Sequence, residues 1–497
     1  RFERDGHVSL AGRTRTLPSD DTPLRIGLVC CGDYSAGHFA SYRALADTDV
    51  DMVIHLGDYV YADPEGDVRP VEPERDAVTR ADYRRRYQQV RRDPDLQALH
   101  LRHPMITVID DHDLADNATS TGAKGHDPDT QGEWADRLEA ATSERLVWLP
   151  IRAKGPSGRR APAQWRSVEL GTLGPLVLLD TRLGGRDPHA DVDEPGLHDP
   201  HRTILGGDQM LWARARLRDT SRPWALLVSS VVVNPMTIPV PGRRKVKKPF
   251  PAGYMVEDGV ALNSDGWDGY PAARARLTEA LRNRGFGGVI LSGDVHSSWA
   301  FEGPSDDDGP VAVELTCPAV TSEPMGEMVP LVASVVEDLL SAGEEVRWAD
   351  IDNHGHLVVE VGPEQLSAAW WFTDPRDPEA RAELGAHWVT TPHAPRLTPG
   401  DPSEAPGVPG VFRPVLEPTV VVPATSGATR IPRSRATRAA DGAPATVPVP
   451  PRPESVGASS RSRGRSLATL AVGAVVGAVV VAWARRAVGD VVAQRQG

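Results

Sequence analysis

Residues 53–61 read Val53-Ile54-His55-Leu56-Gly57-Asp58-Tyr59-Val60-Tyr61. The first four residues form a short apolar run that is typical of a buried strand, and the Gly-Asp pair ends it. Three more apolar runs end in polar residues in the same way, namely Ile26–Val29 before Cys30-Cys31, Met105–Ile109 before Asp110-Asp111-His112-Asp113, and Gly288–Leu291 before Ser292-Gly293-Asp294-Val295-His296. Because ligands of α/β sheets bind beyond the carboxyl ends of the strands, we expect these polar residues to share one cleft.

Strand and helix patterns alternate from Leu24 to about Thr373, which predicts a layered α/β domain. We place this domain at residues 23–394 and interpret residues 1–22 as the remnant of something that precedes the core. Helices are predicted at 39–46, 80–100 with an interruption at Asp93-Pro94, 133–148, 209–217 and 272–284. Further strands are predicted at 176–179, 225–228, 311–314 and 357–360.

Composition narrows the class of protein. The chain has 497 residues and a net charge of −13, with its acidic residues spread along the sequence. It has no broad basic surface pattern, so a nucleic-acid-binding scaffold is not expected. Its three cysteines are too few for a disulfide framework and leave the redox compartment open. The sequence also leaves the oligomeric state open.

The last hundred residues differ from the rest. Residues 395–466 are rich in Pro, Ala, Ser, Thr and Arg, and we interpret them as a disordered linker. Residues 467–484 are an uncharged run of mostly Ala, Val and Gly, followed by a short tail at 485–497. This hydrophobic helix is interpreted as a transmembrane anchor, with an interfacial helix as the alternative. Arginines on both sides make the orientation rule indecisive; we place the preceding domain on the extracytoplasmic face, with the cytoplasmic face as the alternative.

The polar residues after the strands are suited to a polynuclear metal centre. Asp58 can bridge two cations, the Tyr61 phenolate can bind a hard ferric ion, and the Cys31 thiolate is a soft ligand. Asp111 and Asn117 supply oxygen ligands. Two further candidate ligands, expected on one side of an extended segment, are Asp294 and His296. Taken singly, an Asp after a strand is usually a turn former and a Cys there usually packs in the core.

Three other residues are candidates for catalysis. His112, next to Asp111, is placed to contact a phosphorane oxygen or to protonate a leaving alkoxide. Asp113 is expected to orient His112, as carboxylates beside a functional histidine commonly do. Arg182 is expected to hold a phosphate oxygen, and a structural salt bridge is an equally good interpretation of it.

These motifs together resemble the alkaline phosphatase D (PhoD-like) family of calcineurin-like metallophosphoesterases. The resemblance covers roughly residues 8–373 and includes Asp180-Thr181-Arg182 and Asp265-Gly266-Trp267-Asp268-Gly269-Tyr270. It implies a two-sheet α/β sandwich, preceded here by the remnant of an N-terminal β domain. It also implies two kinds of metal ion, Fe³⁺ and Ca²⁺. Cys31, Asp58 and Tyr61 would hold the Fe³⁺, and the other four candidate ligands, Asp111, Asn117, Asp294 and His296, would complete the cluster. Mn²⁺ or Zn²⁺ is the alternative.

The function that follows is metal-dependent hydrolysis of phosphomonoesters or phosphodiesters by a metal-activated hydroxide. The alternative is a catalytically inactive protein that keeps the fold and binds phosphate or acts as a scaffold. The partners expected are a phosphate-ester substrate and, through the helix at 467–484, a membrane. The natural substrate is not fixed by the sequence.

Overall fold

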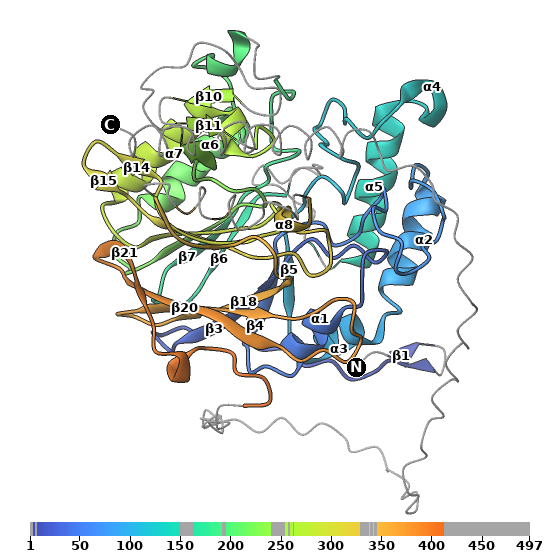
Figure 1. Cartoon of the computed structure of the whole chain (residues 1–497), viewed down its shortest axis with the longest axis horizontal. Coiled ribbons are helices and arrows are strands. Elements are labelled where there is room, and N and C mark those ends of the chain that lie inside the picture. Colours follow the sequence, from blue (N-terminus) through green and yellow to red (C-terminus); the bar gives the residue numbers. More distant parts are fainter. Residues whose placement is uncertain are drawn as a thin grey trace, which may run out of the picture.

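The computed structural model describes most of the chain between residues 3 and 411 (Figure 1). The described residues are 3–4, 7–149, 151, 164–190, 195–239, 254–256, 259–261, 263–328, 337, 341 and 345–411. The rest of the predicted linker, the predicted membrane helix at 467–484 and the tail at 485–497 lie outside them. No helix within the described residues is long and apolar enough to cross a membrane.

Two seven-stranded sheets pack face to face at the centre of the molecule (Figure 1). The first sheet has the order β21 (Ala394–Pro399), β20 (Glu383–Thr391), β19 (Leu366–Phe372), β18 (Gly355–Val361), β3 (Leu24–Val29), β4 (Met52–His55), β5 (Met105–Thr107). The second has the order β17 (Val346–Asp350), β13 (Ser298–Glu302), β16 (Val313–Thr316), β12 (Gly288–Ser292), β8 (Ala225–Val228), β7 (Pro175–Leu178), β6 (Arg166–Glu169). The predicted two-sheet α/β fold is confirmed.

The alternation of side chains along each strand builds the layers. In β3, Ile26 and Leu28 lie in the core between the two sheets, whereas Val29 packs on the outer side. In β12, Leu291 faces the same central core and Ile290 faces outward. Strands that are apolar on both faces are expected where helices cover a parallel sheet. Each large apolar side chain buried in this way contributes about 1.5–3 kcal/mol to the stability of the fold.

Helices cover the outer face of each sheet (Figure 1). On the first sheet, Val53 of β4 packs with Leu45 of α1 (Ala40–Ala46), and the same cluster includes residues of α2 (Arg80–Val90) and α3 (Pro94–Arg102). α5 (Trp134–Trp148) packs beside α2. On the second sheet, Ile290 lies in one cluster with residues of α6 (Gly206–Leu217) and α7 (Pro271–Arg284). The molecule therefore has four layers.

The predicted helices and strands all appear, with ends shifted by a few residues. The predicted interruption at Asp93-Pro94 separates α2 from α3, because the Asp93 carboxylate caps α3 by accepting from the N–H groups of Asp95 (2.9 Å) and Leu96 (3.3 Å). The smaller elements are β1 (Glu3–Arg4), β2 (His7–Val8), β9 (Thr237–Pro239), β10 (Tyr254–Val256), β11 (Gly259–Ala261), β14 (Ser305–Asp306), β15 (Gly309–Pro310), α4 (Pro128–Gln131) and α8 (Met325–Met328). That residues 1–22 are the remnant of a β domain stays a prediction.

The predicted domain end at residue 394 is too early. β21 (Ala394–Pro399) pairs with β20 at the edge of the first sheet, so the linker does not begin at residue 395. Beyond it, the indole N–H of Trp371 donates to the carbonyl of Pro406 (2.9 Å), which fixes the chain against the outer face of the sheet. The high proline content of this region suggested a linker, but prolines are tolerated at a sheet edge, where no further strand needs their N–H.

Parallel strands bring the polar strand ends to one edge of both sheets. β3, β4 and β5 run parallel in the first sheet, and β7, β8, β12 and β16 run parallel in the second. The sheets are joined at this end, because Cys30 after β3 forms a parallel bridge with Ala319 after β16. The carboxyl ends of seven strands therefore open onto the same place, as the sequence predicts.

Candidate metal centre

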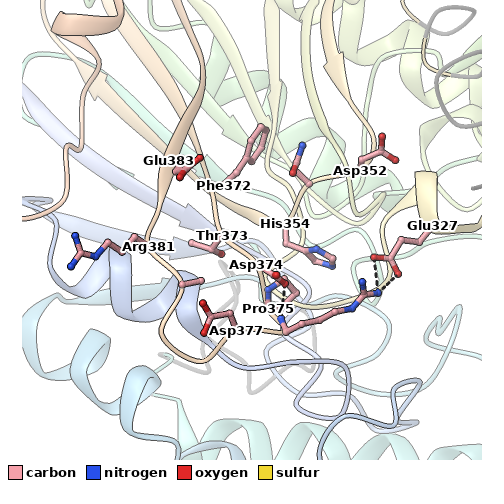
Figure 2. Close-up of a pocket in the computed structure, with 13 residues that line it drawn as sticks. Glu327, Asp352, His354, Phe372, Thr373, Asp374, Pro375, Asp377, Arg381 and Glu383 are labelled. Atoms are coloured by element: carbon pink, nitrogen blue, oxygen red, sulfur yellow. Dashed lines mark hydrogen bonds and ion pairs between the residues drawn. The ribbon is translucent and has the colours of Figure 1, made fainter.

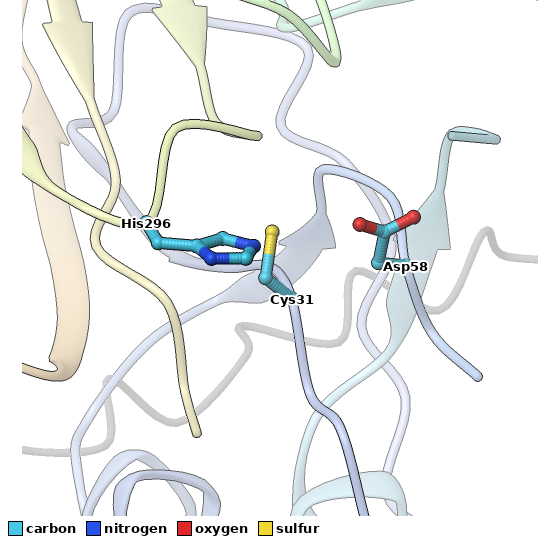
Figure 3. A group of neighbouring side chains, drawn as sticks. All are labelled: Cys31, Asp58 and His296. Atoms are coloured by element: carbon cyan, nitrogen blue, oxygen red, sulfur yellow. The ribbon is translucent and has the colours of Figure 1, made fainter. Parts of the chain in front are cut away.

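Three overlapping groups of possible metal ligands lie at this joined edge. The donor atoms within each group all lie within 4.8 Å of one another, and the groups are Cys31, Asp58 and His296 (Figure 3); Asp58, Asp111 and His112; and Asp110, Asp111 and Asp294. Asp58 belongs to the first two groups and Asp111 to the last two. This chain of shared carboxylates is the arrangement that a polynuclear centre requires, because a shared carboxylate can bridge two cations.

Tyr61 lies in contact with the first group. Its hydroxyl is 3.3 Å from Asp58 Oδ2 and 3.3 Å from His296 Nε2. The other ring nitrogen of His296, Nδ1, lies 2.8 Å from the carbonyl oxygen of Glu323. When Nδ1 donates to that carbonyl, Nε2 presents its lone pair to the centre. The structure thus brings Cys31, Asp58, Tyr61 and His296 together as predicted.

The remaining predicted ligands are distributed more loosely. The backbone N–H of Asn117 donates to Asp111 Oδ2 (2.7 Å), so Asn117 lies beside the predicted ligand Asp111 and is itself half-buried. Asp294 and His296 fall into different groups rather than together. The extended segment expected for these two is corrected to a turn, because β12 ends at Ser292 and both residues have positive φ angles, of 76° and 49°.

The backbone is strained at the site. Within the described residues, every non-glycine residue with a positive φ is a predicted ligand, namely Cys31 (52°), Asp58 (53°), Asn117 (54°), Asp294 (76°) and His296 (49°). This conformation costs a residue that carries a Cβ of order 1–3 kcal/mol, and such residues cluster at functional sites. The left-handed turn lets a side chain at a strand end point sideways into the space between the sheets. Five of the seven predicted ligands are set in this way.

The electrostatics of the site favour a bound cation. Asp58, Asp110 and Asp294 have raised pKa values because burial and neighbouring carboxylates disfavour their charge, and the pKa of Asp110 rises to about 7. Burial, followed by the Cys30 thiol and Asp58, likewise raises the pKa of Cys31. Buried like charges of this kind are costly unless a cation compensates them. The donor set, with thiolate, phenolate, imidazole and carboxylates, fits a transition-metal ion beside a harder one.

Arg182 supplies the positive charge of the chain itself. Its guanidinium is fully buried and pairs with Asp110, with Asp111 and Asp294 (3.2 Å each), and with Asp265 (2.7 Å). Although burial opposes it, these carboxylates raise the pKa of Arg182 and keep it charged. The salt-bridge interpretation of Arg182 is therefore the correct one, and the expected contact with a phosphate oxygen is corrected: with no exposed surface, its donors face carboxylates instead.

His112 lies over the centre but takes a different partner from the predicted one. Its Nδ1 is 3.2 Å from Asp63 Oδ1, and its ring stacks on the Tyr61 ring at 4.3 Å between centroids. Although burial opposes it, Asp63 and Asp111 raise the pKa of His112 well above its usual value. His112 Nε2 is 3.9 Å from Glu65.

The expectation that Asp113 orients His112 is corrected. Asp113 Oδ1 accepts from the backbone N–H of Tyr59 (3.1 Å), and its Oδ2 accepts from that of Asp110 (3.1 Å) and pairs with Arg145 (3.1 Å). Asp113 thereby holds the loops after β4 and β5 in register. Its carboxylate accepts backbone N–H groups from both loops, because buried N–H groups need hydrogen-bond partners.

Several residues of the site were missed by sequence reasoning. Asp110 and Asp265 both stood in quoted motifs, but neither was given a role. Asp63 follows Tyr61 by two residues, and that spacing was a usable signal. Ser322 and Glu323 follow β16 without any motif, so their position here could come only from the topology.

Comparisons with known proteins agree with this geometry. Residues 26–370 match the family described as PhoD-like phosphatase. The chain is 27% identical over 317 residues to alkaline phosphatase D of Bacillus subtilis (strain 168), which covers 60% of this chain and 51% of that protein. The chain thus spans about half the length of this curated relative.

A solved structure of PhoD shares the fold, with a TM-score of 0.67 and 24% identity over 78% of this chain and 74% of that one. The family match includes the ends of β3, β4, β5, β7 and β12, which carry all ten predicted site residues. Because it extends over more than half of the sequence, the chain belongs to the PhoD-like phosphatase family.

Proposed function

We propose that this protein hydrolyses phosphate esters with the help of metal ions held at the joined edge of its two sheets. The observation that carries the proposal is the coincidence of two independent features in the same residues. The donor atoms of Cys31, Asp58, Asp294 and His296 converge in overlapping groups, and these same residues hold the strained, left-handed backbone. Buried like charges and a strained backbone both lower the stability of the fold, and a scaffold that does not catalyse a reaction would have no reason to keep them.

Each residue has a role in this reaction. Bound cations supply charge for a phosphoryl group and lower the pKa of water. Asp58 and Asp111 would hold the cations, and Arg182 keeps the surrounding carboxylates in place. His112, held at Nδ1 by Asp63, presents Nε2 as a proton donor for the leaving oxygen. The stacked ring of Tyr61 fixes the plane of that imidazole.

The proposed metals are Fe³⁺ and Ca²⁺, with Mn²⁺ or Zn²⁺ as the alternatives. Support for iron comes from the Cys31 thiolate and the Tyr61 phenol on one side of Asp58, a pair of ligands that a pure Mg²⁺ or Ca²⁺ site does not need. Support for a second, harder ion comes from the all-carboxylate group of Asp110, Asp111 and Asp294.

The decisive experiment measures metal content and turnover together. The full chain is loaded with each candidate metal and assayed on an aryl phosphomonoester and a bis-aryl phosphodiester, beside Asp58→Asn and the matched control Asp51→Asn. Asp51 is also a buried carboxylate, directly before β4, but it binds Arg15 and the N–H of Arg25 instead of the centre. We expect Asp58→Asn to lose at least about 10³-fold in turnover and one equivalent of metal, because it removes a shared ligand. Wild-type turnover in the Asp58 variant, or a metal-loaded wild type inactive on both esters, contradicts the proposal; the latter result favours the binding or scaffolding alternative.

A membrane location is a separate proposal that rests on sequence. Residues 467–484 are uncharged and flanked by arginines, which supports a membrane anchor joined to the catalytic domain by the Pro-rich linker. The test compares the full chain with a chain that ends at residue 411. We expect only the full chain to remain with the membrane fraction after a high-salt wash, and protease treatment of intact cells then tells which face holds the catalytic domain. Equal release of both forms contradicts the anchor.

A further inference from the structure

Residues 321–323 form a short segment after β16 that contacts three predicted ligands. Its backbone N–H groups at Thr321 and Ser322 both lie 3.3 Å from the carbonyl oxygen of Cys31. One residue further, the Glu323 carbonyl is the partner of His296 Nδ1 at 2.8 Å. The segment follows β16 of the second sheet and Cys31 follows β3 of the first, so these contacts connect the two halves of the site.

The Ser322 side chain makes the most direct of these contacts. Its Oγ lies 2.7 Å from the hydroxyl oxygen of Tyr61 and 3.0 Å from the carbonyl oxygen of Cys31. Ser322 is 1% exposed, so water does not compete for these bonds. A serine hydroxyl has one proton and two lone pairs: it can donate to the Cys31 carbonyl while it accepts from a Tyr61 phenol, or donate to Tyr61 when Tyr61 is a phenolate. Both partners are parts of the predicted iron ligands.

Ser322 is also supported from the side away from the centre. Its backbone carbonyl lies 3.0 Å from Nε2 of His354, a side chain that is 8% exposed. His354 lines a cavity of about 520 Å³ together with Glu327 of α8 and Phe372 (Figure 2). Ser322 is thus held at its backbone by the cavity wall while its hydroxyl reaches the centre.

We propose that Ser322 is a positioning residue of the metal centre, which fixes the Tyr61 hydroxyl relative to the Cys31 main chain, two groups from residues that would hold a metal ion. The inference rests on the proposed function, because it assumes that Tyr61 and Cys31 bind metal. The residue acts through these two ligands and does not itself contact substrate. Polar partners that orient metal ligands typically change metal affinity or activity by 10–100-fold when they are removed.

The test uses ferric iron added to the metal-stripped full chain. Iron bound by a phenolate has a visible charge-transfer absorption band, and the rate of its loss to a chelator reports how firmly the ligands hold it. We compare wild type, Ser322→Ala, Ser322→Thr, which keeps the hydroxyl, and Ser367→Ala. Ser367 is the matched control, since it is also a buried serine bonded to a histidine (Oγ to His387 Nε2, 2.7 Å) but lies in β19, away from the centre.

We expect Ser322→Ala to shift or weaken the absorption band and to lose iron about 10–100-fold faster than wild type. Ser322→Thr, which keeps the hydroxyl, should have a band and a rate of iron loss close to those of wild type. Ser367→Ala should match wild type. An unchanged band and loss rate in Ser322→Ala overturn the inference while leaving the proposed function standing. If the proposed ferric site itself is wrong, the wild type will show no absorption band, so this outcome is distinguished from failure of the inference about Ser322. Should Ser322→Ala not fold, Ser322→Cys replaces it, since a thiol of similar size is only a weak donor.

Discussion

The strand interiors and the strand ends of this protein follow opposite rules. Within β12, Leu291 is apolar, fully buried and in regular strand geometry, and two residues after its last residue Asp294 is charged, strained and surrounded by other carboxylates. The interiors lower the free energy of the folded state, and the ends raise it. The comparison shows that the site at the strand ends is unfavourable by itself. It forms because the apolar core between the sheets stabilises the fold by more than the site costs, as is common for functional sites.

Removal of the buried counter-charge should have the largest effect. Arg182→Met leaves Asp110, Asp111, Asp265 and Asp294 without their shared guanidinium, and loss of one partner from a buried charge network typically costs about 3–5 kcal/mol. Chemical denaturation of the metal-free protein measures this loss. Arg182→Lys is the control and should recover part of the stability, because it keeps a charge but not the fork of donors. A metal-free Arg182→Met protein as stable as wild type would refute this account of the strand ends.

A change in the strand interior should separate stability from metal binding. Leu291→Ala opens a cavity between the sheets, and large-to-small core changes of this kind cost about 2–5 kcal/mol. Because Leu291 makes no polar contact with the centre, the affinity for metal measured under native conditions should stay within about twofold of wild type. A loss of metal affinity in proportion to the loss of stability would contradict the view that core packing in the strands and metal binding at their ends are independent.

The metal-free protein should become less stable as the pH rises. Burial, opposed by Arg182 and reinforced by Asp111, raises the pKa of Asp110 to about 7 in the folded state, whereas an unfolded Asp has a pKa of about 3.9. A raised carboxyl pKa favours the folded state fully below pH 4 and loses this contribution as the pH passes through about 7. We therefore expect the melting temperature of the metal-free protein to fall between pH 5 and 8.

Two controls sharpen this measurement. Asp110→Asn cannot ionise and should flatten the dependence, and bound metal should raise the melting temperature more at pH 8 than at pH 5, because protons and cations compete for the same carboxylates. A melting temperature that rises from pH 5 to 8 in both the wild type and Asp110→Asn would show that other groups dominate.

The sequence predicted the strand interiors well and the contacts at the strand ends only in part. The strands containing Leu226 and Leu291 were predicted because a short apolar run is visible in the local sequence. The convergence of Cys31, Asp58, Tyr61 and His296 followed from a general rule of parallel sheets. The partners inside the site did not follow, because they depend on turns whose left-handed backbone no periodic pattern encodes.

His112 shows this limit most clearly. The carboxylate next to it in sequence, Asp113, was the expected partner, but the turn after β5 directs that side chain to Arg145 and brings Asp63 to the imidazole from another strand end. β21 was missed for a related reason: its prolines argue against a strand in isolation, and only its position at the sheet edge permits them. The His112 error concerns segments that are distant along the chain, whereas β21 pairs with the strand directly before it and was missed because of its prolines.

The smallest predicted effect concerns this imidazole. Asp63→Asn keeps the size of the side chain but removes the charge that holds His112 Nδ1, so His112 should be a poorer proton donor. Leaving groups of high pKa need that proton, and their esters should react about 10–100-fold more slowly, while nitrophenyl esters change little. The measurement is the rate over a series of aryl and alkyl phosphates of rising leaving-group pKa. A uniform loss over the series would mean that Asp63 only supports the fold of its loop, and Asp116→Asn, which alters a neighbouring carboxylate without a bond to His112, provides the comparison.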